Sequence, residues 1–215
     1  MPAIGRLVRT ILGKRASRWV GRWYRAVFVD LDVVAQIVAR EIPSAAHVLD
    51  VGGGDGALVD RLLDLRPDIV VTTLDVAPAV GQWIAERHSP RVNRMPSTSL
   101  QDYLASGGRP AQAILLTDVM HHVPAEARNG LLQTITSMLS ASPSPRVIVK
   151  DVEPGHWRSR LGYLSDRYVT GDRNVRLVSR SDLVAAIRRI ESAIQCSETE
   201  LFTRDRPNYA VVFWR

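Results

Sequence analysis

The chain has 215 residues, of which 46% are hydrophobic, and its formal net charge is +6. That length can bury one full hydrophobic core, but it leaves little room for the separate substrate domain of an NAD-dependent dehydrogenase. The single cysteine argues against a disulfide framework, and no apolar run approaches the roughly 20 residues that a membrane-spanning helix needs.

The first 40 residues combine basic with apolar and aromatic side chains. Arg15, Arg18 and Arg22 are interleaved with Trp19 and Trp23, which is typical of one or two amphipathic helices. Basic helices with tryptophans lie on anionic membranes or bind nucleic acid, and the charge of the chain permits either. Because the segment lacks the uninterrupted apolar run of a secretory leader, we expect a cytoplasmic protein.

An apolar strand then runs into closely spaced glycines between residues 48 and 56. Gly52, Gly54 and Gly56 lack a Cβ atom, so the backbone can turn sharply out of the strand and let a ligand lie directly against it. A second apolar run ends in Asp75, roughly 20 residues further on, where ribose-binding acids sit in doubly wound nucleotide folds. Together the two segments predict a nucleotide site.

Two ligand classes are compatible with this turn. The glycine spacing also satisfies the dinucleotide fingerprint of NAD enzymes, with Ala57 in the last position. However, Asp50 stands two residues before the first glycine and adds negative charge beside the turn. A diphosphate is disfavoured by that charge and a cationic ligand is favoured. A glycine-rich turn that binds no ligand is the plain alternative.

The pattern Asp-x-Gly-x-Gly-x-Gly that begins at Asp50 resembles motif I of the class I S-adenosylmethionine (SAM)-dependent methyltransferases. The resemblance implies that the glycines approach the methionine moiety, that Asp75 binds the ribose hydroxyls and that Val76 lies against the adenine. Ser99 follows the third strand near the adenine region of that family, although it also fits an ordinary helix cap. The expected SAM contacts are Asp50, Gly52, Gly54, Gly56, Asp75, Val76, Ser99 and Asp118.

Further along the chain, apolar runs alternate with helical patterns at βα spacing, which predicts an α/β fold with a parallel sheet covered on both faces. The final two strands should form an antiparallel hairpin, because the segment between them is too short for a crossover helix. We expect strands near 46–51, 69–75, 91–95, 112–118, 146–152, 193–202 and 208–214, and helices near 56–66, 78–88, 99–106, 125–140 and 180–192.

The resemblance implies a Rossmann-like, seven-stranded, mostly parallel sheet with this C-terminal hairpin. It also favours a lid role for the N-terminal helices, which in small methyltransferases of this class close over the SAM site. We therefore expect an N-terminal helical lid over residues 1–40 and a SAM-dependent methyltransferase domain over 41–215. Peripheral membrane contact through the basic N-terminus is the alternative, and no nucleic-acid partner is expected. The sequence leaves the oligomeric state open.

Candidate catalytic groups follow the fourth and fifth strands, at the edge where open α/β sheets bind ligands. Because a sulfonium already activates the methyl group, the protein must align the acceptor and remove its proton. An imidazole oriented by a carboxylate suits that task. We predict that His121 or His122 acts as the base with Asp151, and we prefer His122. The alternative is that a histidine only packs the turn.

The same groups are also compatible with a divalent metal. A magnesium ion shared with a vicinal-diol substrate could lower the pKa of the acceptor hydroxyl, with Asp118, Asp151 and Glu153 as the candidate ligands. The chain has no HExxH motif and no pair of cysteines, which argues against a tight zinc site. The nearby groups considered for this role are Asp118, His121, His122, Asp151, Glu153 and His156.

The acceptor class is suggested by the polar and aromatic segment 156–174. Aromatic faces beside Asp, Asn and Arg suit a carbohydrate, and they also suit a quinol or phenol. The two histidines and Asp151 resemble the arrangement in sugar O-methyltransferases, including mycobacterial ones of methylmannose polysaccharide biosynthesis. We therefore expect a methylated mannoside or manno-oligosaccharide as the small-molecule acceptor. The alternatives are a quinol or phenolic metabolite, a lipid substrate, or a SAM-binding regulatory module without turnover.

Overall fold

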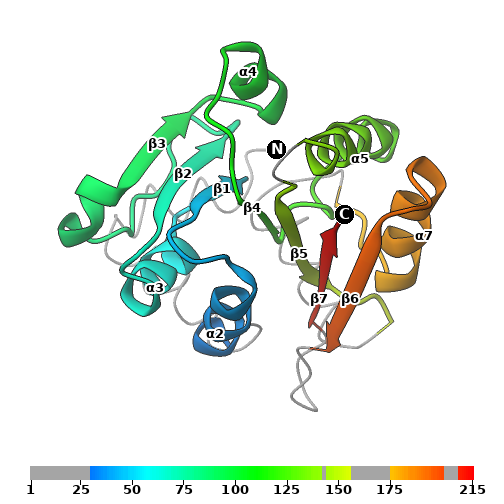
Figure 1. Cartoon of the computed structure of the whole chain (residues 1–215), viewed down its shortest axis with the longest axis horizontal. Helices are drawn as coiled ribbons and strands as arrows, with labels where there is room; N and C mark the ends of the chain where they lie inside the picture. The colour runs from blue at the N-terminus through cyan, green and yellow to red at the C-terminus, as the bar shows by residue number, and fades with distance from the viewer. Residues whose placement is uncertain (1–29, 142–143, 156–174, 201–207) are drawn as a thin grey trace, which may run out of the picture.

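The computed structural model describes residues 30–141, 144–155, 175–200 and 208–215. Its strands form one sheet in the order β3-β2-β1-β4-β5-β7-β6 (Figure 1). The neighbouring strands from β3 to β5 are parallel, whereas β7 pairs antiparallel with both β5 and β6. The strands are β1 (His47–Val51), β2 (Val70–Asp75), β3 (Val92–Pro96), β4 (Ala113–Thr117), β5 (Arg146–Val152), β6 (Gln195–Glu200) and β7 (Asn208–Trp214). The Rossmann-like sheet with an antiparallel end is confirmed.

Helices cover both faces of this sheet, and two apolar clusters fill the space between. One cluster joins the sheet to α2 and α3, and the other joins it to α4, α5 and α7. The helices are α2 (Leu31–Glu41), α3 (Ala57–Leu65), α4 (Leu100–Ala105), α5 (Ala125–Leu139) and α7 (Arg180–Ile190), with a 3-10 helix η1 (Glu86–Arg91). Across the described ranges, none of them has the length and apolarity to cross a membrane.

The central strands are apolar at consecutive positions because both of their faces are buried. Ile114 packs in the cluster with α5 and α7, whereas Leu115 packs in the cluster with α2 and α3. Val147 and Ile148 divide between the two clusters in the same way. Side chains alternate along a strand, so a parallel strand covered on both faces needs an unbroken apolar run.

The helix expected over 78–88 is wrong. This segment is a loop that ends in η1, and part of its backbone is hydrogen-bonded to the glycine turn. The Gly81 N–H donates to the Gly54 carbonyl at 2.9 Å, and the Trp83 N–H donates to the Asp55 carbonyl at 2.8 Å. Gly81 also has a φ of +68°, outside helical geometry. These tertiary hydrogen bonds override the local helical pattern.

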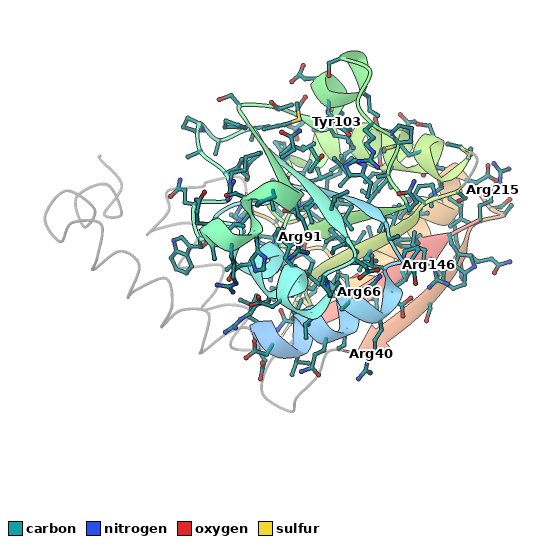
Figure 2. All side chains as sticks on the ribbon, turned by 60° about the vertical axis from the view of Figure 1, so that its left-hand side comes forward. Arg40, Arg66, Arg91, Tyr103, Arg146 and Arg215 are labelled. Atoms are coloured by element: carbon teal, nitrogen blue, oxygen red, sulfur yellow. The ribbon has the colours of Figure 1, made fainter. Side chains whose placement is uncertain are left out.

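The first described helix, α2, packs on α3. Its side chains Val34, Ala35 and Val38 are buried in the cluster with α3. Arg66, at the end of α3, binds the C-terminal end of α2 (Figure 2): its guanidinium donates to the carbonyls of Ala39 and Ile42, each at 2.7 Å. Residues 1–29 lie outside the described part of the chain, so the lid stays a prediction.

Candidate active site

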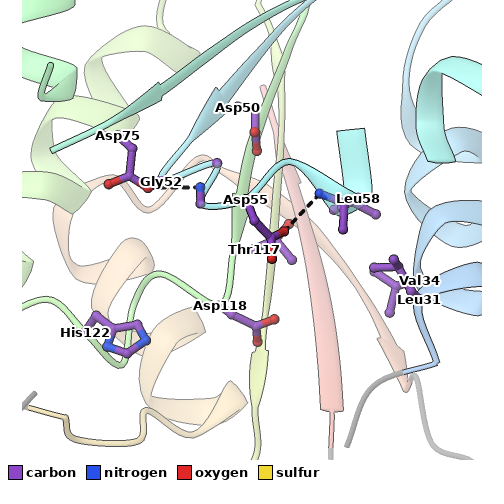
Figure 3. Close-up of a pocket in the computed structure, with 13 residues that line it drawn as sticks. Leu31, Val34, Asp50, Gly52, Asp55, Leu58, Asp75, Thr117, Asp118 and His122 are labelled. Carbon is purple, nitrogen blue, oxygen red and sulfur yellow. Dashed lines mark hydrogen bonds between the residues drawn. The ribbon is translucent and has the colours of Figure 1, made fainter. Parts of the chain in front are cut away.

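A pocket of about 370 Å³ opens at the carboxyl ends of β1, β2 and β4. Figure 3 shows Asp118 and His122 on the chain that follows β4, away from Leu31 and Val34 of α2. The lining residues are Leu31, Val34, Asp50, Gly52, Gly53, Gly54, Asp55, Ala57, Leu58, Asp75, Thr117, Asp118 and His122. The structure therefore gathers the predicted residues Asp50, Gly52, Gly54, Asp75, Asp118 and His122 around one space.

The glycine turn is held against β2 by its own backbone. The N–H groups of Gly52 and Gly53 both donate to the Leu74 carbonyl, at 2.8 and 3.1 Å. Gly54 has a φ of +53°, and a Cβ atom built on it would meet nothing within 4 Å. Its missing side chain therefore leaves pocket space open. Gly56 lies outside the pocket lining and is the N-cap residue of α3, where a Cβ would lie 2.6 Å from Ile84 Cγ1.

Asp50 is a buried acid beneath this turn. Its side chain accepts a hydrogen bond from the Thr73 hydroxyl at 2.7 Å. Burial raises the pKa of Asp50 to about 6; the Thr73 hydrogen bond opposes this shift, and the nearby Asp75 carboxylate adds to it. A Cβ atom at Gly53 would overlap both the Thr73 hydroxyl and the Asp50 carboxylate. Gly53 was not among the residues predicted from the sequence, although the unbroken Gly-Gly-Gly run was a signal for it.

Asp75 lies at the end of β2, on the rim of the pocket. Its carboxylate accepts the Gly54 N–H at 2.9 Å and the Ala77 N–H at 2.8 Å, which fixes its orientation. Val76 is outside the lining, but its side chain is 75% exposed beside Asp75. Ser99 lies in a capping box at the start of α4, where its hydroxyl accepts the Asp102 N–H at 3.1 Å. The structure thus places Ser99 in the helix cap rather than in the pocket lining.

The two histidines have different surroundings. His121 is buried, and its Nδ1 lies 2.5 Å from Asp151 Oδ1. His122 is exposed and lines the pocket, with its ring centroid 4.1 Å from that of His121. Sequence analysis expected one histidine both to face the pocket and to bind Asp151. The structure divides these two properties between the neighbouring residues.

Asp151 is held as a carboxylate despite its complete burial. Burial alone raises the pKa of this carboxyl, but the His121 imidazole, its hydrogen bond, the Val152 N–H and the Lys150 ammonium together bring the pKa below its ordinary value. The Val152 N–H donates to Oδ1 at 2.7 Å, and the His121 backbone N–H donates to Oδ2 at 3.2 Å. An ionised carboxylate at Nδ1 keeps the proton on that nitrogen and leaves Nε2 as the basic one.

Sequence analysis did not predict a role for Lys150, which lies in β5. The side chain of this residue is completely buried, and its Nζ binds the two Asp118 carboxylate oxygens at 2.6 and 2.8 Å. Asp118 itself has a φ of +58°, in the left-handed region that non-glycine residues rarely adopt. A lysine inside an apolar strand was the available signal, because a buried ammonium requires a charged partner.

The metal candidates come together only in part. Among the described residues, Asp118, His121 and Asp151 each offer one ligand atom within 4.8 Å of the others. Glu153 lies outside this group and accepts the Arg180 N–H at 3.0 Å, at the start of α7. Both Asp118 oxygens already hold the Lys150 ammonium. The Lys150 ammonium thus supplies, beside Asp118, the positive charge that the metal hypothesis assigned to a magnesium ion. His156 lies outside the described residues.

Comparison with known proteins decides the family. Residues 23–191 match the methyltransferase domain family. The chain belongs to this family. Over 125 residues it is 29% identical to the demethylspheroidene O-methyltransferase of Rhodobacter capsulatus. The aligned segment makes up 57% of this chain and 30% of that relative. The chain therefore spans less than a third of the length of this curated relative.

Solved methyltransferase structures share the fold. An O-methyltransferase family protein from Burkholderia thailandensis superposes with a TM-score of 0.66 at 15% identity, over 85% of this chain and 55% of its own. The 1,6-didemethyltoxoflavin-N1-methyltransferase of the same organism, solved with S-adenosylhomocysteine, gives 0.66 at 17% identity, over 92% and 82%. The mitomycin 7-O-methyltransferase MmcR gives 0.62 at 22% identity, over 87% and 54%.

The comparisons give no support to a sugar acceptor. None of the relatives named above has a sugar or a polysaccharide pathway in its name. The segment 156–174, on which the carbohydrate expectation rested, lies outside the described residues. What the family supports is the coarser prediction of a methyltransferase.

Proposed function

We propose that this protein is a SAM-dependent O-methyltransferase that methylates a hydroxyl group of a quinol or phenolic metabolite. One observation carries the proposal: the glycine turn and an imidazole–carboxylate pair lie at the same edge of the sheet, and Asp118 lies near both. One ligand atom each of His121 and Asp151 lies within 4.8 Å of Asp118, and Asp118 lines the pocket beside Gly52 and Gly54.

The charge of the pocket fits SAM better than a dinucleotide. Its described lining contains Asp50, Asp55 and Asp75, together with Asp118, whose charge Lys150 balances, and it contains neither lysine nor arginine. Carboxylates repel the phosphates of a dinucleotide and attract the sulfonium and ammonium groups of SAM. The open space at Gly54 lets a ligand approach the backbone, and Asp75 is already oriented by two N–H groups. These residues would hold the methionine moiety and the ribose hydroxyls, respectively.

The acceptor side needs a base for the hydroxyl proton. When bound, SAM supplies a methyl group that its sulfonium already activates. His121 is our preferred base, because Asp151 keeps the proton on Nδ1 and so leaves Nε2 to accept the proton of the acceptor. Asp151 would then stabilise the imidazolium that forms. His122 is the second candidate, because it lines the pocket itself.

The acceptor class is inferred from the relatives. Two of the O-methyltransferase structures that share this fold carry 2-hydroxy-5-methyl naphthoic acid and apigenin. Both are phenolic molecules, and this favours our alternative over the mannoside expected from the sequence. The same fold also serves an N1-methyltransferase. A positioned base favours a hydroxyl acceptor here, because an alcohol or phenol must lose a proton as it gains the methyl group.

The test is transfer of a labelled methyl group from SAM to a paired panel of quinols, phenols and reducing manno-oligosaccharides. We expect label in the quinol and phenol set, with activity lost in His121→Ala. Label only in the mannosides would overturn the acceptor class and leave the cofactor site standing. Absence of SAM binding by calorimetry would overturn the proposal at its root.

A further inference from the structure

A buried cation, Lys150, lies beside the side chains of the proposed active site. Lys150 is completely buried, and its ammonium takes both oxygens of Asp118 at 2.6 and 2.8 Å. Asp151 is the next residue of the same strand, and the Lys150 charge lowers the pKa of its carboxyl. The ammonium therefore lies close enough to interact with two carboxylates, although it is hydrogen-bonded to only one.

The backbone brings Asp118 to Lys150. The Asp118 N–H donates to the Lys150 carbonyl at 2.9 Å, and the residue adopts the left-handed region with a φ of +58°. Residues in this region persist only where their surroundings hold them there. A buried ammonium that loses its partner is strongly destabilising, so Lys150 needs a negative group, and Asp118 provides it.

Because Asp118 satisfies Lys150, the Asp151 carboxylate can serve His121. Its Oδ1 binds His121 Nδ1, and its Oδ2 accepts the His121 backbone N–H. We propose that Asp118 and Lys150 form a positioning pair: Asp118 holds the Lys150 ammonium so that Asp151 is left to orient His121. The catalytic consequence of this inference rests on the proposed function. The structural part, in which Asp118 holds Lys150 and Asp151 orients His121, does not depend on it.

The pair predicts an unusual order among variants. In Asp118→Asn the amide cannot neutralise the ammonium, so Lys150 should turn to Asp151 and compete with His121 for it. Adding Lys150→Met removes the competitor and should return Asp151 to His121. The double variant should therefore behave more like the natural protein than Asp118→Asn does. If the two residues only supported the fold, the second substitution would still recover stability by removing the unpaired ammonium, but the His121 tautomer would be the same in all three proteins.

The first experiment reports the His121 tautomer and needs no acceptor. Ring ¹⁵N chemical shifts of the full chain, assigned with His121→Gln, distinguish Nδ1–H from Nε2–H. We expect Nδ1–H in the natural protein, a mixture in Asp118→Asn and Nδ1–H again in the double variant. The same tautomer in all three proteins, or a double variant that resembles Asp118→Asn, would overturn the proposal.

The second experiment separates turnover from binding. Because Asp118 also lines the pocket, the SAM dissociation constant is measured for every variant, and the comparison is made on kcat at saturating SAM. A positioned base contributes a rate factor of about 10²–10⁴, and Asp118→Asn should lose part of it, so that kcat falls at least about tenfold. Adding Lys150→Met should recover most of that loss. Equal kcat in the single and double variants would refute the catalytic consequence. Absence of turnover in the natural protein would instead count against the proposed function.

Discussion

The turn at Gly54 allows a direct test of the cofactor site with a matched control. Gly54 has a φ of +53°, lines the pocket, and has nothing within 4 Å of the position that a Cβ would take. Gly107 has a φ of +75° and equally open surroundings, but it lies outside the pocket lining. Gly54→Ala and Gly107→Ala therefore impose the same kind of backbone strain, and only the first puts a methyl group into the proposed SAM site.

The magnitudes follow from that difference. An alanine held in the left-handed region costs about 1–2 kcal/mol, which in a chain of this size lowers Tm by roughly 2–8 °C. Both variants should show this loss. At Gly54 the added methyl group also occupies space that a ligand needs against the backbone, so we expect the SAM dissociation constant to rise at least about tenfold, or about 1.4 kcal/mol. Gly107→Ala should bind SAM like the natural protein.

Calorimetric titration with SAM, beside thermal unfolding of both variants, measures the two quantities independently. A Gly54→Ala variant that keeps its SAM affinity while losing stability would show that the ligand does not lie against this turn. An equal loss of affinity in both variants would show that backbone strain alone explains the effect.

Three further outcomes follow from the site. Burial raises the pKa of Asp50 from 3.8 to about 6, so ionisation of this acid opposes folding. The raised pKa adds about 3 kcal/mol to the free energy of unfolding below pH 4, and this contribution is lost as the pH rises through 6. Asp50→Asn should therefore raise Tm at pH 7.5, with a gain that disappears by about pH 4, while SAM binding weakens; an unchanged Tm at pH 7.5 would contradict the burial argument. His121→Ala should lower kcat on the order of 10²–10⁴-fold with SAM affinity retained, and an equal or larger loss in His122→Ala alone would move the base to the pocket-lining histidine. Activity should survive EDTA, because Lys150 already neutralises Asp118; a loss of activity that magnesium restores would revive the metal hypothesis.

Local patterns determined most of the fold. The strands begin and end within two residues of their expected positions. The same holds for the expected helices, except the one over 78–88. The reason is that burial on both faces requires apolar runs that are visible without any knowledge of the partner strands. The glycine turn and Asp75 were predictable for a similar reason, because both lie where a strand ends and their spacing is itself the signal.

Contacts between distant segments decided the rest. The helical pattern of segment 78–88 is overridden by its backbone hydrogen bonds with Gly54 and Asp55. The assignment of Asp151 to His121, 30 residues away, depends on how β4 and β5 align. The role of Lys150 likewise exists only because the turn after β4 places Asp118 over its ammonium. A sequence shows which charged groups are present, but which of them share a partner is set by the distances that folding creates.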